Sequence, residues 1–308
     1  MEKRNVKQIV LPLITAFIWG SSFVAQSLGA DKLGGFTFSA ARSLPAMAAL
    51  SAMWIIVRHI RHEPKYTAQQ RKNLIRGGLV CGVLLTLGMN LQQFGIAETA
   101  AGKAGFITAL YIVLVPLGGV FLGRKASKRL FFCVAIAVVG LYLLCFKGDG
   151  GPVSFGRGDF LVFLSAFVFA AHILVVDHFV QQVDGVALSC VQFMVMTLVS
   201  TVCAFTFETV DFGVVAECWL YILYVGVLSG AVGYTLQILA QKDGDPTVVS
   251  LLLSLEAFFA VVCGALILHE RMSGREYIGC ALMLAAVLIS QLPEKKRMAQ
   301  QEQEPPRA

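Results

Sequence analysis

The sequence predicts an all-α integral membrane protein. Hydrophobic residues make up 57% of its 308 residues and charged residues only 14%. A soluble domain carries roughly 25% charged residues, because polar side chains must cover its core. The apolar residues form ten runs of about 20 residues, the length that a helix needs to cross the hydrocarbon core of a bilayer. Lys and Arg gather in the short segments between these runs.

Each of the ten runs is expected to form one transmembrane helix, because uniformly apolar segments lack the alternation of a membrane-barrel strand. The first run is long and has no cleavage motif at its end, which favours a spanning helix over a signal peptide. The segment after Pro293 is rich in Gln, Glu and Pro and is expected to be disordered. The expected spans are 8–28, 35–57, 74–94, 103–122, 130–147, 159–178, 187–207, 218–240, 247–268 and 275–292.

Basic residues indicate the orientation of these spans. If the runs cross alternately, 18 of the 25 Lys and Arg fall on one side and six on the other, and Arg42 lies within a span. Basic loops remain in the cytoplasm. Both termini are therefore predicted to be cytoplasmic, and the acidic segment with Glu208, Asp211 and Glu217 to be outside. The net charge of +6 is read as this topology signal, and no nucleic-acid partner is predicted.

The two halves of the chain resemble one another. Gly88-Met-Asn-Leu-Gln92 matches Gly233-Tyr-Thr-Leu-Gln237, and the same offset of 145 places Ile107–Tyr111 against Leu252–Glu256. A repeat of five spans is odd-numbered, so the second copy must enter the membrane inverted. Inverted repeats are typical of secondary transporters, whose substrate site lies near the midplane between the copies. The predicted units are 1–147, 148–292 and the tail 293–308.

Several motifs resemble the drug/metabolite transporter superfamily, in its EamA-repeat branch, over residues 8 to 292. The resemblance implies a multi-pass secondary transporter of small metabolites, often an exporter, in a cell membrane such as the bacterial inner membrane. Two positions differ from the family pattern: Phe169 stands where the Trp of the first span is often repeated, and Ala257 where Pro is usual. The motifs are Trp19-Gly-Ser-Ser-Phe23, Phe36-x-x-x-Ala-x-Arg42, Leu110-Tyr-x-x-x-x-Pro116, Ser254-Leu-Glu256 and His269-Glu270-Arg271.

Two charged residues are expected within spans, where a charge at the bilayer centre costs about 2.5–3.5 kcal/mol on insertion scales. Arg42 has a planar fork that suits a carboxylate or phosphate. Glu256 is placed near the midplane as a proton-coupling carboxylate or the partner of a substrate ammonium. The alternative is structural: Arg42 pairs with Glu256 or extends to the interface, and Glu256 caps unwound backbone. A zwitterion such as an amino acid would satisfy both residues.

Other polar residues at similar depth are expected to line a wet cavity, although each alone is more often a hydrogen bond between helices. His172 is a candidate proton relay. Trp19, Tyr111 and Tyr234 lie inside spans, away from the interfacial belt, and are candidates for cavity walls or for ordinary packing. The uncharged polar candidates are Ser22, Asn90, Gln92, Gln192 and Gln237.

The leading hypothesis is therefore a proton-coupled exporter of an amino acid or related metabolite. Export of hydrophobic or aromatic cations is the alternative within the transporter class. A membrane-embedded enzyme is disfavoured, because no GxSxG or HExxH motif is present. A non-transporting sensor would be expected to have a larger soluble part. The expected partners are a small-molecule substrate and the lipid bilayer, for a monomer or homodimer; no cofactor or metal is predicted, since the eight cysteines lack CxxC spacing.

Overall fold

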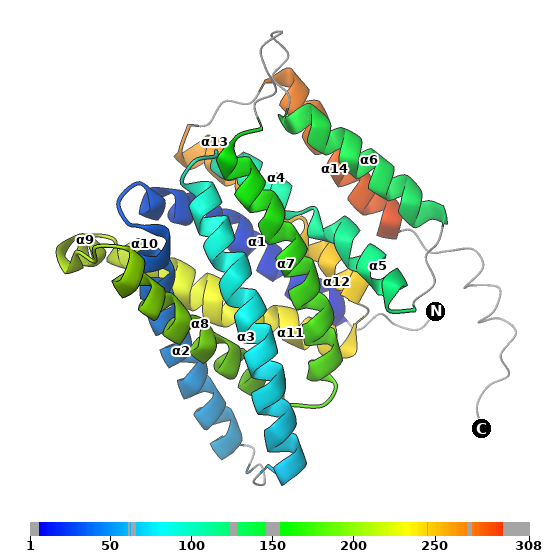
Figure 1. Cartoon of the computed structure of the whole chain (residues 1–308). Helices are drawn as coiled ribbons and strands as arrows, with labels where there is room; N and C mark the ends of the chain where they lie inside the picture. Colours follow the sequence, from blue (N-terminus) through cyan, green and yellow to red (C-terminus); the bar gives the residue numbers. More distant parts are fainter. Residues whose placement is uncertain are drawn as a thin grey trace, which may run out of the picture.

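The regular structure of the chain is helical throughout the residues that the computed structural model describes, which are 6–60, 62, 66–123, 128–145, 155–244, 246–269 and 273–291 (Figure 1). The expected disordered tail and the residues Glu270 and Arg271 lie outside these ranges. The helices of the first half are α1 Val6–Ala30, α2 Gly35–Ile60, α3 Ala68–Ile96, α4 Ala101–Thr108, α5 Tyr111–Phe121 and α6 Lys128–Cys145. Those of the second half are α7 Arg157–Val180, α8 Gly185–Phe207, α9 Phe212–Glu217, α10 Trp219–Leu223, the π-helix η1 Tyr224–Gly233, α11 Tyr234–Asp243, α12 Pro246–Leu253, α13 Glu256–Ile267 and α14 Gly274–Gln291.

Seven helical segments of the described chain are long and apolar enough to cross a membrane. Three further segments, in α6, α13 and α14, are apolar but shorter. The chain is thus a multi-pass helical membrane protein. The seven segments are Ile9–Ala30, Gly35–Ile60, Ala68–Ile96, Ala101–Phe121, Arg157–Val180, Gly185–Phe207 and Trp219–Lys242.

Helix α1 occupies the centre of the bundle, where it packs against α13, η1, α11 and α12 (Figure 1). Helix α3 packs along α7 and α8, and α2 packs along α8 and η1, so helices from the two halves interleave. Helices α6 and α14 form an antiparallel pair at one side of the bundle, against α5 and α12. This arrangement places the middle of α1 and the breaks described below at the core of the molecule.

The boundaries of the helices correspond between the two halves. The turn between α1 and α2, residues 31–34, has its counterpart 150 residues later between α7 and α8, at 181–184. Helices α6 and α14 each have 18 residues. A two-residue turn divides α4 from α5 at 109–110, and the same turn divides α12 from α13 at 254–255, which is an offset of 145.

These turns correct the prediction that 103–122 and 247–268 are single helices, since each is two helices in series. Neither turn contains Gly or Pro. Pro116 lies within α5, six residues after the break, and Ala257 stands at the position where the family pattern has Pro. A proline is therefore not what breaks either helix. The break leaves the N-terminus of a short helix inside the membrane, which is the form that ion and substrate sites of transporters take.

The run 218–240 is also not one regular helix, because its middle forms the ten-residue π-helix η1. A single turn of π-helix is rare and often marks a functional site. Gly226 of η1 lies so close to α2 that an added Cβ would overlap the carbonyl oxygen of Arg42. Gly226 and Gly230 therefore bring η1 against α2 within one molecule, in place of the dimer contact that a small-xxx-small pattern can also make.

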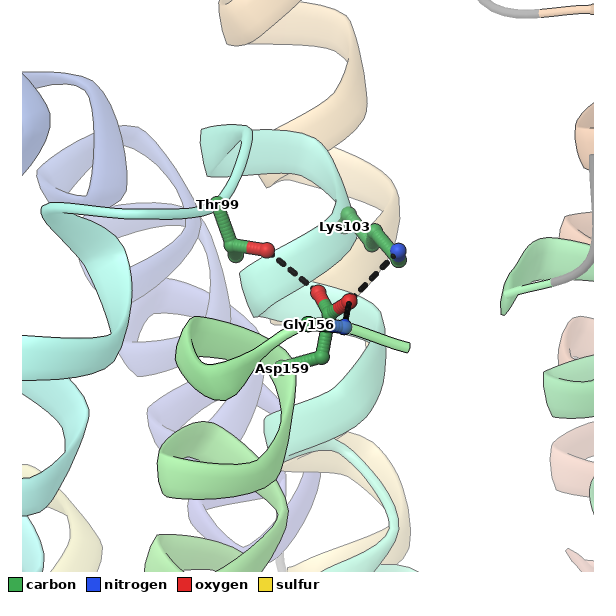
Figure 2. Close-up of polar contacts among 4 residues, drawn as sticks. All are labelled: Thr99, Lys103, Gly156 and Asp159. Carbon is green, nitrogen blue, oxygen red and sulfur yellow. Dashed lines mark hydrogen bonds and ion pairs between the residues drawn. The ribbon is translucent and has the colours of Figure 1, made fainter. Parts of the chain in front are cut away.

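A buried polar cluster joins the two halves at one end of the bundle (Figure 2). The Asp159 carboxylate, on the first turn of α7, accepts hydrogen bonds from the Thr99 hydroxyl and, at 2.9 Å, from the Gly156 backbone N–H. The Lys103 Nζ of α4 lies 2.8 Å from Asp159 Oδ2. Side chains of Asp159 and Lys103 are only 4% and 17% exposed, so this pair is largely shielded from water.

The N-terminus of α2 is capped by a carboxylate from the opposite half. Glu208, at the end of α8, accepts hydrogen bonds from the backbone N–H groups of Phe36 and Thr37 at 2.9 and 2.8 Å. At the corresponding start of α8, the helix is capped by Asp184, which belongs to the turn that directly precedes it. Residue 34 is Gly where its counterpart 184 is Asp, so Glu208 supplies the anion that the helix N-terminus favours.

We expect Asp159→Asn to lower the free energy of unfolding by about 3 kcal/mol, because it removes the negative charge of a largely shielded ion pair with Lys103. The matched control is Arg157→Gln, which removes a neighbouring pair with Glu98 whose side chains are 78% and 43% exposed. An exposed pair contributes about 0–1 kcal/mol. Thermal unfolding in detergent checks both variants, and equal shifts would show that the Asp159 cluster does not hold the halves together.

Candidate functional site

One cavity lies in the core of the bundle, between the middle of α1 and the broken span of α12 and α13. Its volume is about 40 Å³, room for about three water molecules, so a metabolite enters only if the helices or side chains move. The lining residues come from both halves. They are Trp19, Ser22, Phe23, Gln26, Arg42, Met89, Gln92, Thr108, Tyr111, Phe169, His172, Ile173, Ser229, Tyr234, Gln237 and Glu256.

Arg42 is 2% exposed and reaches the cavity from the first third of α2. Its Nη1 donates to Gln26 Oε1 at 2.6 Å, and its Nη2 lies 3.5 Å from Met89 Sδ. The Arg42 Nε has no hydrogen-bond partner, and no carboxylate pairs with the guanidinium, in the part of the chain that the structure describes. The cation is thus held by neutral groups only.

Glu256 is 2% exposed and is the first residue of α13. A carboxylate at a helix N-terminus is favoured by the free N–H groups and the helix dipole. Its neighbour Tyr111 is the first residue of α5 and so occupies the corresponding place in the other half. Among the described residues, Glu256 Oε1 has no hydrogen-bond partner, and Glu256 forms no ion pair with Arg42.

Close packing of α1 positions this carboxylate. Gly20 lies against α13, and a Cβ added there would overlap the carbonyl oxygen of Glu256 and the side chain of Phe259. Any larger residue at position 20 would push α13 away from α1. The glycine of the Trp19-Gly-Ser-Ser-Phe23 motif therefore fixes the distance between the first span and the break that carries Glu256.

His172 lies on α7, 1% exposed, and its Nε2 is 3.0 Å from Gln192 Oε1 on α8. This hydrogen bond resembles the one between Gln26 and Arg42, which also joins the first two helices of a half. Gln192 occupies the position 150 residues after Arg42, so the second half has a neutral amide where the first half has a cation.

The remaining polar candidates have separate partners. Gln92 Nε2 donates to Thr108 Oγ1 at 3.1 Å, and Gln237 Nε2 donates to Gln241 Oε1 at 3.0 Å. Ser22 contacts Gln26 from one helical turn away. Asn90 is not among the lining residues; its amide donates to Thr86 O and Ser200 Oγ and so joins α3 to α8.

Aromatic side chains form one wall of the cavity. The rings of Trp19 and Tyr234 have centroids 4.8 Å apart. Trp19 Nε1 donates to the carbonyl oxygen of Ser229 in the π-helix at 3.1 Å. The Tyr234 hydroxyl lies 3.7 Å from the sulfur of Met89, the residue 145 positions earlier. Phe169 lies on α7 where the family pattern often has Trp, and it also lines the cavity.

The cavity thus brings together nine of the eleven candidates named from the sequence: Trp19, Ser22, Arg42, Gln92, Tyr111, His172, Tyr234, Gln237 and Glu256. Gln192 does not line the cavity, but it forms a hydrogen bond with the lining residue His172. Sequence reasoning missed Met89, Thr108 and Ser229. Met89 could have been found from the sequence, because it lies 145 positions before Tyr234 and so corresponds to it in the other half. Thr108 precedes the unpredicted break, and Ser229 takes part through a backbone carbonyl, which a side-chain pattern does not reveal.

A bundle of membrane helices around a central polar cavity is the architecture of a membrane transporter. The sequence model of the EamA-like transporter family matches residues 6–146 and again residues 156–291. The chain therefore belongs to the EamA-like transporter family, within the drug/metabolite transporter superfamily.

Curated relatives carry the same general description. An uncharacterized transporter of Archaeoglobus fulgidus is 28% identical over 94% of this chain and 87% of its own length. The uncharacterized transporter YwfM of Bacillus subtilis is 24% identical over 97% and 98%. A solved structure titled only as the crystal structure of a protein matches with a TM-score of 0.68 at 15% identity, over 97% of this chain and 100% of that one, which shows the fold alone.

We expect Gln26→Ala to lower the free energy of unfolding by about 2 kcal/mol, because it removes a hydrogen bond to a buried cation. Gln192→Ala is the matched control: it truncates an equally buried glutamine whose partner is an imidazole in place of a guanidinium. We expect about 1 kcal/mol there. Thermal unfolding at pH 8 measures both, and an equal or larger loss in Gln192→Ala would contradict this account of Arg42.

Proposed function

We propose that this EamA-family transporter is a secondary active carrier of an amino acid or related zwitterion, which it exports in exchange for protons by alternating access. One observation carries the proposal. The cavity has one cation and one carboxylate, Arg42 and Glu256, both buried and not paired with each other. A zwitterion offers each of them an opposite charge, at one site, with no net charge moved into the membrane.

The two charges come from opposite halves of the chain. The counterpart of Arg42 is the neutral Gln192, and the counterpart of Glu256 is Tyr111. A substrate held by its carboxylate to α2 and by its ammonium to α13 would therefore link the halves. The small cavity, about 40 Å³, supports a cycle in which the halves move apart to admit substrate and close around it.

The proposed topology is ten spans in two inverted five-helix repeats, with both termini in the cytoplasm of a bacterial cell. Seven spans meet the length and composition of a membrane helix, and α6, the pair α12 and α13, and α14 supply the others. The corresponding turns and breaks, and the two matches of the family description, support the repeat. Five spans per copy require inversion, and the basic loops support the orientation.

Glu256 is the residue that we assign to proton coupling. Its Oε1 has no hydrogen-bond partner among the described residues. Tyr111, the first residue of α5, lies beside it. A carboxylate that binds either a proton or the substrate ammonium exchanges one for the other. That competition is sufficient to couple the outward movement of substrate to the inward movement of protons.

A second candidate is export of aromatic cations. The observation that favours it is the aromatic wall formed by Trp19, Tyr111, Phe169 and Tyr234 beside the Glu256 carboxylate. Aromatic faces and a carboxylate together bind a cation that is held weakly by either alone. In this candidate Arg42 has a structural role, with Gln26 and Met89 as its partners, and substrates do not need a carboxylate.

Arg42→Gln separates these two functions. We expect it to reduce amino-acid transport in proteoliposomes at least 100-fold, because a neutral amide does not form the bidentate bond to a carboxylate. Transport of an aromatic cation should change less than threefold. The conservative Arg42→Lys should keep part of the amino-acid activity. Amino-acid transport by Arg42→Gln at the wild-type rate would exclude the carboxylate site.

Glu256→Gln separates coupling from binding. We expect this variant to lose accumulation driven by a pH gradient, while exchange of labelled for unlabelled substrate across the vesicle membrane persists at a reduced rate, since exchange needs no proton transfer. The matched control is Gln237→Ala, which alters an uncharged residue that lines the same cavity and should keep gradient-driven transport. Gradient-driven transport by Glu256→Gln would exclude this residue as the coupling site.

A further inference from the structure

A second hollow lies on the outer surface of α3, far along the helix from the central cavity. It is a groove of about 680 Å³ lined by Tyr66 and by one face of the first half of α3. The residues of that face are Ala68, Arg71, Lys72, Ile75, Arg76, Leu79 and Val80. None of them belongs to the transport site described above.

The groove is basic at one end and apolar at the other. Arg71, Lys72 and Arg76 are exposed and form no ion pair within the described ranges. One or two turns further along, Ile75, Leu79 and Val80 are 47%, 50% and 41% exposed. Side chains three and four residues apart share a helix face, so Lys72, Ile75 and Leu79 form one continuous stripe from charge to hydrocarbon.

The length of α3 places this change of character at the membrane surface. Its 29 residues span about 44 Å, whereas the hydrocarbon core of a bilayer is about 30 Å thick. The surplus corresponds to about nine residues. The charged residues of α3 are at its N-terminal end, up to Arg76, and from Gly77 to its end the helix has no charged residue. The basic residues therefore lie at headgroup depth and Leu79 and Val80 among the acyl chains.

Tyr66, at the mouth of the groove, is held by its neighbours. The guanidinium of Arg58 lies over the Tyr66 ring, 4.2 Å from its centroid, and Trp54 Nε1 donates to the Tyr66 hydroxyl at 3.4 Å. The next residue, Thr67, caps α3 in a capping box with Gln70. The groove is thus a formed feature at the interface, where Trp, Tyr and Arg are the usual anchors.

We propose that this groove is a binding site for one anionic phospholipid, with its headgroup phosphate on Arg71, Lys72 and Arg76 and an acyl chain along Ile75 and Leu79. Charge complementarity selects the headgroup, because three cations that have no acidic partner among the described residues face the headgroup region. The exposed apolar stripe selects a lipid over a free anion. With the termini in the cytoplasm, as proposed above, the groove faces the cytoplasmic leaflet, whose surface potential is negative.

The test is native mass spectrometry of the full-length protein in detergent, titrated with phosphatidylglycerol or with phosphatidylcholine of the same acyl chains. The wild type is expected to retain phosphatidylglycerol preferentially. The triple variant Arg71→Gln, Lys72→Gln and Arg76→Gln should lose that preference, with at least tenfold weaker binding, since each basic residue near a membrane surface contributes about fivefold. Equal retention of the two lipids by the wild type would overturn the proposal.

The matched control removes three positive charges predicted on the same side but outside the groove: Lys128→Gln, Arg129→Gln and Lys242→Gln. It should bind phosphatidylglycerol like the wild type, and an equal loss in both triple variants would show only a net-charge effect. Glycerol phosphate in excess should not displace the lipid; displacement would assign a free-anion site. If the triple variant does not fold, Arg71→Gln and Arg76→Gln alone should each weaken binding about fivefold, and unchanged binding in both overturns the proposal.

Discussion

The structure depends on keeping two opposite charges buried in the same cavity without letting them pair. Isolated charges are costly within a membrane protein, and removing the partner of a buried charge is strongly destabilising. Arg42 is stabilised by the Gln26 amide and the Met89 sulfur, and Glu256 by its place at the start of α13. Gly20 lets α1 approach α13 at that start, and Gly226 lets the π-helix approach the backbone of Arg42. The close helix contacts and the broken span thus serve the same two side chains.

The two halves of the chain have corresponding helix boundaries but different central residues. Helix ends, turns and breaks correspond between the halves, but the residues at the centre differ: Arg42 has Gln192 as its counterpart, and Glu256 has Tyr111. The ends of the bundle differ too, because Glu208 caps α2 from the opposite half whereas Asp184 caps α8 from its own turn. In the proposed inverted repeat, a symmetric scaffold would supply two nearly equivalent arrangements, and the unequal residues would decide what binds between them.

Much of this follows from the sequence. The apolar runs predicted the helices of the membrane, and depth within those runs led to Arg42, Glu256 and most of the cavity, because a polar residue in lipid needs a partner or a wet site. The breaks at 109–110 and 254–255 were not predictable in this way, since neither contains Gly or Pro and Pro116 lies inside α5. The π-helix was also missed, because hydropathy does not distinguish it from an α-helix. Ser229 acts through its backbone carbonyl, and Glu208 caps a helix far away in the sequence. Both contacts depend on how the helices pack, which the sequence pattern of a single segment does not reveal.

The proposed function requires Arg42 and Glu256 to bind a zwitterion together. The most direct measurement is the thermal stabilisation of the purified protein by amino acids, their decarboxylated amines and their deaminated acids. A ligand present at about 100 times its Kd stabilises by about 2.7 kcal/mol. An amino acid should stabilise the wild type, whereas its amine and its acid should not. The effect should be lost in Arg42→Gln and weakened in Glu256→Gln. Stabilisation by the amine alone, unchanged in Arg42→Gln, would contradict the binding of a zwitterion by Arg42 and Glu256.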